Sequence, residues 1–95
     1  IGIAYNADDG DIYFYKNGTV QNSGTAAYTN LDGLTLMPAV GDGVGNAAGQ
    51  YFCNFGNPTF SISSGNADAN GYGNFEYAPP SGYYSLCTKN LAQYG

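Results

Sequence analysis

The sequence contains no histidine and no tryptophan, and only two of its 95 residues are lysine or arginine. Without histidine, a Ser-His-Asp triad, a His-based acid–base pair and a histidine metal ligand are all excluded. Lys16 and Lys89 stand far apart in a chain whose net charge is −5. They do not form the clustered basic surface that phosphate groups require. We therefore expect no nucleic acid and no anionic membrane surface among the partners.

Long apolar runs and cysteines are also scarce. No stretch approaches the ~20 apolar residues that cross a bilayer, so we expect no membrane insertion. The two cysteines, Cys53 and Cys87, are too few for a zinc site. Two interpretations stay open for them. They are two small buried apolar side chains, which we favour, or they form a disulfide, which depends on a Cα separation that the sequence does not give.

Glycine, with 15 residues, and tyrosine, with 10, dominate what is present. Apolar side chains alternate with small or polar ones over residues 1–5 and again over 12–15, which is the period of a half-buried strand. Asn17-Gly18 then supplies the two residues that a type I′ hairpin turn prefers. The sequence therefore predicts an antiparallel meander from its first residue, with a short strand at 19–21.

Three further strands are predicted, over residues 34–40, 51–56 and 83–87. Pro38 cannot donate to a sheet ladder, so the first of them belongs at an edge or a bulge. No segment shows a helical period over three turns, which makes the fold class all-β. The expected core face comprises Ile1, Ile3, Ile12, Phe14, Leu36, Val40, Cys53, Phe55 and Leu86.

Four motifs, which occur in the same order as in a known family, carry a resemblance. They are GIAYNADDGDIYFYKNGT at 2–19, LMPAV at 36–40, CNFG at 53–56 and APPSGYYSL at 78–86. Together they resemble the SPRY (B30.2-like) family, and most of all the SPRY-like modules of phage and algal-virus structural proteins. The resemblance implies an antiparallel β-sandwich of the SPRY or concanavalin A-like type.

A SPRY domain has further strands before the GIAY strand, so we expect this chain to be a partial domain. Residues 1–87 would be its C-terminal part, with residues 61–75 as a long loop insertion. Residues 88–95 would be a linker to a following segment.

The function implied by the resemblance is that of a non-enzymatic structural or binding module in a viral fibre, tail or virion surface protein. Its partners would be other virion subunits or copies of itself in a homo-oligomer, at the virion or extracellular surface. One hypothesis is host-surface recognition of a glycan or protein. A second is a purely architectural, subunit-packing module, and a third is a cellular SPRY adaptor that binds a peptide. No cofactor is expected.

An acidic cluster between the first two strands is the best candidate for chemistry. Asn6, Asp8, Asp9 and Asp11 offer oxygen ligands for Ca²⁺. Gly10, however, comes one position too early for the glycine of an EF-hand loop. The alternative, which we favour, is a hairpin loop that uses Asp and Gly for turn geometry. The same acids crowd one turn and lack a cleft, so we expect no glycosidase-like pair and no enzyme activity.

Tyrosines and the long polar loop are the better candidates for binding. An exposed tyrosine offers a flat apolar face and a hydroxyl group, which suit a sugar ring or another protein. The alternative is ordinary cross-strand packing. Loops longer than about 12–15 residues are uncommon inside a domain and are often functional, which favours residues 61–75. The expected binding residues are Tyr13, Tyr15, Asp68, Asn70, Tyr72 and Tyr77.

Overall fold

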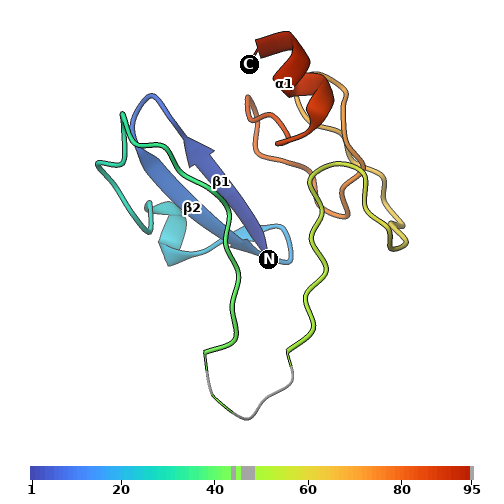
Figure 1. The fold of residues 1–95 in the computed structure, drawn as a ribbon, viewed down its shortest axis with the longest axis horizontal. Helices are drawn as coiled ribbons and strands as arrows, with labels where there is room; N and C mark the ends of the chain where they lie inside the picture. The colour runs from blue at the N-terminus through green and yellow to red at the C-terminus, as the bar shows by residue number, and fades with distance from the viewer. Residues whose placement is uncertain (44, 46–48, 95) are drawn as a thin grey trace.

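The computed structural model describes residues 1–43, 45 and 49–94. Three strands, β1 (Gly2–Asn6), β2 (Asp11–Lys16) and β3 (Thr19–Val20), form one antiparallel sheet in the order β1-β2-β3. A short 3₁₀ helix, η1 (Asn22–Gly24), follows the sheet, and an α-helix, α1 (Thr88–Tyr94), lies near the C-terminus. The sheet and the C-terminal part lie beside each other (Figure 1). Between them projects a long extended segment, described at residues 34–43, 45 and 49–55, which we call the excursion.

The β1–β2 hairpin confirms the prediction made from alternation. Its register runs from Gly2 opposite Tyr15 to Asn6 opposite Asp11. Inside the connecting loop, the Asn6 side-chain oxygen accepts hydrogen bonds from the amides of Asp8 and Asp9 at 3.1 and 3.3 Å. The acidic cluster is therefore a hairpin loop in the structure, held by Asn6.

The turn between β2 and β3 also agrees with the sequence. Asn17 and Gly18 have φ values of 50° and 76°, as a type I′ turn requires at both central positions. Tyr77 lies against this turn, because a Cβ built on Gly18 would stand 2.8 Å from its ring. Gly18 thus serves both the turn and a close approach between distant parts of the chain.

The loop after β3 folds back over the open side of β2. Tyr28 forms an isolated bridge with Ile12, and the Phe14 and Tyr28 rings meet edge to face with centroids 6.4 Å apart. The Tyr5 hydroxyl donates to the Leu31 carbonyl at 3.0 Å. The half-buried Ile12 and Phe14 therefore pack on a loop and not on a second sheet.

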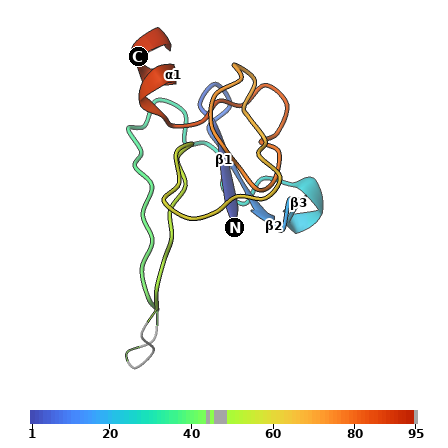
Figure 2. The same ribbon diagram turned by 90° about the vertical axis from the view of Figure 1, so that its right-hand side faces the viewer.

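Residues 66–94 form the C-terminal part (Figure 2). Asn66 and Phe75 pair through two backbone hydrogen bonds of 2.8 Å, and the connection closes with Gly71 at φ 77°. A small hairpin closed at Asn70-Gly71 thus agrees with the sequence. The segment expected to be a linker contains helix α1, in which Asn90 is 6% exposed.

Three expected strands are not formed, and this part of the prediction is wrong. Residues 34–40, 51–56 and 83–87 have no strand assignment. A strand needs a paired neighbour, and no backbone–backbone hydrogen bond involves residues 35–43 or 49–65 in the part of the chain that the structure describes. The described residues hold a single three-stranded sheet, so a sandwich is not shown.

The expected core face is also mostly wrong. Among the apolar residues that the structure describes, Ala4 alone is buried, with 5% of its surface exposed. The core residues that are exposed are Ile1, Ile3, Leu36, Val40, Cys53, Phe55 and Leu86. They are exposed because no second layer covers them in the described part of the chain. Ile12 and Phe14 are half-buried.

Candidate functional site

A buried carboxylate organises the C-terminal part. Asp68 is 8% exposed and sits in the long loop that the sequence selected. One of its oxygens accepts hydrogen bonds from the amides of Asn70 and Tyr72, both at 2.9 Å. The other accepts from the Ser85 amide at 2.8 Å, the Ser85 hydroxyl at 2.6 Å and the Asn90 side chain at 2.7 Å. We call these five hydrogen bonds the Asp68 clasp.

Three further hydrogen bonds fasten helix α1 to the clasp. The Asn90 side-chain nitrogen also donates to the Ser85 carbonyl at 2.8 Å, and its oxygen accepts from the Asn70 side chain at 2.7 Å. The Tyr94 hydroxyl donates to the Asn70 side chain at 3.3 Å. The loop, the 83–87 segment and α1 are therefore held together by polar groups.

The clasp keeps the Asp68 carboxylate ionised. Burial raises the pKa of this carboxyl, but the hydrogen bonds from Ser85, Tyr72 and Asn90 outweigh it and hold the pKa well below its ordinary 3.8. Both oxygens face internal donors. Asp68, which we predicted as a binding residue, therefore stabilises the loop in this structure.

A depression opens beside the clasp, where α1 begins. It measures about 380 Å³ and is lined by Gly56, Asn57, Tyr72, Gly73, Cys87, Thr88 and Lys89. The Lys89 ammonium lies 5.3 Å from the centre of the Tyr72 ring, which is cation–π distance. This depression combines an aromatic face, a cation and neutral hydrogen-bonding groups.

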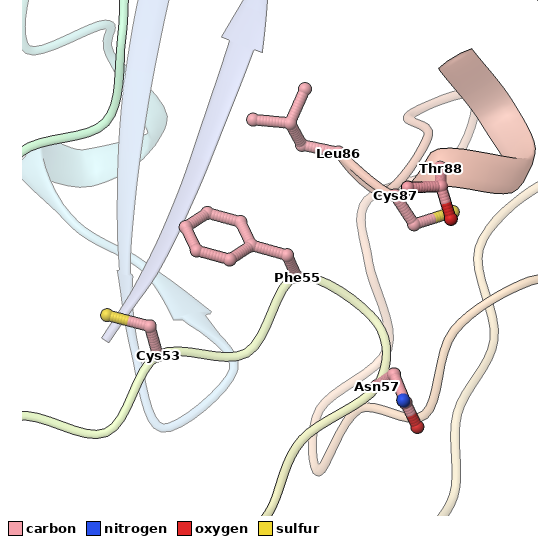
Figure 3. Close-up of a pocket in the computed structure, with 6 residues that line it drawn as sticks. All are labelled: Cys53, Phe55, Asn57, Leu86, Cys87 and Thr88. Carbon is pink, nitrogen blue, oxygen red and sulfur yellow. The ribbon is translucent and has the colours of Figure 1, made fainter. Parts of the chain in front are cut away.

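A second depression of about 260 Å³ adjoins it and contains both cysteines (Figure 3). Phe55 and Leu86 lie between the two cysteines, and the sulfur atoms point away from each other. Both thiols are free, Cys53 being exposed and Cys87 half-buried. The structure therefore lacks the disulfide and corrects the burial expected for Cys53. A hydrogen bond from the Ser85 hydroxyl lowers the pKa of the Cys87 thiol.

The four predicted tyrosines lie in three places. Tyr72 lies with Asp68 and Asn70 in the loop, whereas Tyr13 and Tyr15 lie on β2 and are half-buried. Burial raises the pKa of Tyr13, as does its hydrogen bond of 3.4 Å to Asp11.

Tyr83 of the C-terminal part lies near the β2 tyrosines. Burial raises the pKa of Tyr83, and the charge of a nearby Tyr15 phenolate raises it further. Tyr77 is 51% exposed and packs over the Gly18 turn. The structure thus brings Asp68, Asn70 and Tyr72 together, and places the other predicted residues elsewhere.

A second carboxylate closes the base of the loop. Glu76 accepts a hydrogen bond of 2.8 Å from the Ser63 amide and another from the Ser63 hydroxyl, and its carbonyl accepts one from Ser64. The Ser63 bonds lower the pKa of Glu76. Among the described residues, no group of three or more acidic, cysteine or histidine side chains is placed to hold a metal ion. No described helix is long and apolar enough to cross a membrane.

Sequence reasoning missed Ser85, Lys89 and Asn90. They lie 17 to 22 residues beyond their partners Asp68, Asn70 and Tyr72, and no local pattern marks such a pairing. The one available indication was Asp68 itself, an acid in a loop otherwise rich in neutral turn residues. Comparison with protein-family models, curated proteins and solved structures finds no match for this chain.

Proposed function

We propose that this chain is a non-enzymatic structural or binding module, the C-terminal part of a SPRY-like β-sandwich in a virion fibre, tail or surface protein. The observation that carries the proposal is the apolar surface of the extended excursion. Met37 is 81% exposed, Phe52 66% and Val40 60%. Apolar surface gathered on one feature of a protein marks a contact with other protein.

The dimensions of the chain support the same conclusion. Its Cα radius of gyration is 14.1 Å, whereas a compact domain of this length has about 12 Å. The excess reflects the excursion, described at residues 34–43, 45 and 49–55, which projects from the rest of the molecule (Figure 1). Its described residues 35–43 and 49–55 make no backbone–backbone hydrogen bond, so this segment is suited to packing against neighbouring subunits or further strands. Architecture is therefore the primary role in this proposal.

Host-surface recognition is the second candidate, and the depression beside Tyr72 favours it. Tyr72, Asn57 and Lys89 offer a flat ring, an amide and a cation around one hollow. Such a set suits a sugar ring or a polar protein surface. A single contact of this size binds weakly, so a fibre would rely on several copies acting together.

The architectural role is tested by changing the excursion alone. Met37, Val40 and Phe52 are replaced together by serine, and wild type and variant are compared by analytical ultracentrifugation and by binding of an apolar dye. We expect the wild-type chain to associate and to bind dye, and the variant to do both less with an unchanged circular dichroism spectrum. A wild-type chain that is monomeric, binds no dye and melts cooperatively would contradict the proposal.

Host recognition needs a separate experiment on multimeric protein. Tyr72→Ala should reduce binding to host cells without lowering the melting temperature. Tyr84→Ala is the matched control, because Tyr84 is an exposed tyrosine that lies outside both the depression and the excursion. Equal cell binding by both variants and wild type would remove the recognition candidate and leave the architectural one.

A further inference from the structure

Residues 35–43 run as an extended segment that projects from the rest of the molecule (Figures 1 and 2). At its far end, the Gly41 carbonyl accepts a hydrogen bond from the Tyr51 hydroxyl, and the Asp42 carboxylate accepts one from the Gly49 amide. None of residues 35–40 makes a backbone–backbone hydrogen bond within the described chain. Leu36, Met37 and Val40 are 43%, 81% and 60% exposed. Open backbone donors and acceptors beside apolar side chains are the features of a strand that pairs with another segment.

The two edges of this segment differ. In a β-ladder, the N–H and C=O of one residue point to the same edge, and successive residues point to opposite edges. Pro38 has no N–H, so the edge formed by Leu36, Pro38 and Val40 is interrupted at its centre. The opposite edge, formed by Thr35, Met37 and Ala39, keeps every donor and acceptor. We call it the Met37 edge.

Charge selects the partner. Residues 33–41 contain no charged side chain, and the exposed Asp32 and Asp42 stand at the two ends. Asp32 lies in a turn just before the extended segment. If a second copy paired antiparallel about Met37, Asp32 of each copy would come to the same end of the paired strands as Asp42 of the other. Like charges brought close together repel each other. A strand that carries lysine or arginine at both ends of an apolar stretch would instead pair with both acids.

Resting on the proposed function, we infer that the Met37 edge receives an antiparallel β-strand from a different polypeptide segment, apolar in its centre and flanked by lysine or arginine. Backbone hydrogen bonds hold the strand in place. Asp32 and Asp42 select it over an acidic strand and over a second copy of this chain.

The probe is a synthetic ten-residue peptide in which valine and threonine alternate between two lysines at each end. The control peptide has glutamates in place of the lysines. Fluorescence anisotropy with the 95-residue chain should give a dissociation constant about tenfold lower for the lysine peptide at low salt, since exposed ion pairs contribute modestly and are screened. The difference should shrink as salt is raised. Asp32→Asn together with Asp42→Asn should remove it.

Backbone methylation tests the edge itself. Cys53 allows the chain to be assembled by ligation of residues 1–52 to 53–95, so a single N-methyl group can be introduced chemically. N-methyl Met37 blocks the Met37 edge, and N-methyl Leu36 blocks the interrupted edge while keeping every side chain. We expect the first to weaken peptide binding on the order of tenfold, because it removes one hydrogen bond and obstructs its neighbours. The second should change binding by less than about twofold.

The outcomes separate this inference from the proposed function. If both N-methyl variants lose peptide binding equally, or if neither loses any, strand addition at the Met37 edge is refuted. If the chain nevertheless associates through its apolar side chains, the proposed function stands. Equal affinity for the lysine and glutamate peptides overturns the charge selection, and self-association that excludes the peptide overturns the choice of partner. A chain that neither associates nor binds either peptide refutes both proposals.

Discussion

Removing the Asp68 carboxylate should loosen the whole C-terminal part. In Asp68→Ala, five donors from four residues lose their acceptor. A donor left unsatisfied in a buried site costs about 1–3 kcal/mol. The clasp lies close to the surface of a small protein, where water can reach several of these donors. We therefore expect a total loss of about 2–3 kcal/mol rather than the sum.

Amide hydrogen exchange is the appropriate assay, because it reports local opening. The amides of Tyr72 and Ser85 should exchange about 30- to 150-fold faster in the variant, which is the same free energy expressed as a rate ratio. Asp8→Ala is the matched control, since the exposed Asp8 side chain lies in the first hairpin loop. Unchanged protection of Tyr72 and Ser85 in Asp68→Ala would refute the clasp.

The same carboxylate predicts a pH dependence. Its pKa in the folded protein lies below the ordinary 3.8, so the unfolded chain takes up the proton first as pH falls. The stability from Asp68 is therefore fully present above about pH 5 and is lost progressively below about pH 4. Asp68→Asn should flatten the acid limb of a stability–pH curve. An acid limb as steep as that of wild type would show that other carboxyls dominate.

Three further predictions address the rest of the chain. Gly18→Ala and Gly33→Ala should each cost about 1–2 kcal/mol from positive φ, with Gly18 the larger because Tyr77 must move while Gly33 has open space; urea titration measures the difference. Phe55→Ala should cost about 1 kcal/mol or less, because Phe55 is 47% exposed; a melting temperature many degrees lower would mean that it is buried. EDTA should leave the melting temperature unchanged, and an upward shift with Ca²⁺ would make residues 6–11 an ion site.

The first hairpin was predictable because each determinant is local. Alternation over a few residues defines β1 and β2, and Asn17-Gly18 defines the turn whichever contacts form later. The strand predicted at 34–40 had similar alternation, yet a strand also needs a neighbour, and sequence alone does not reveal whether one is present. The local pattern therefore predicted the propensity to form a strand but not the pairing of that strand with a neighbour.

The candidate site was predictable in part for a related reason. Loop length and composition selected residues 61–75, which hold Asp68, Asn70 and Tyr72. The role of Asp68 depends on Ser85 and Asn90, which are distant in sequence. Helix α1 spans seven residues, too few for the helical period to stand out. The sequence therefore indicated where the site lies, whereas its hydrogen-bonding partners came from the structure.

The short span of the Asp68 clasp bears on the order in which the chain folds. Its longest closure joins residues 22 positions apart, and the entropic cost of loop closure grows only slowly with length, at about 0.6 kcal/mol per doubling. Residues 66–94 can therefore assemble as soon as they exist, without waiting for the β1–β2 hairpin. The hairpin is equally local. The chain should thus have two nuclei that can form separately, and limited proteolysis within residues 34–43 should leave two fragments that each keep their own protected amides.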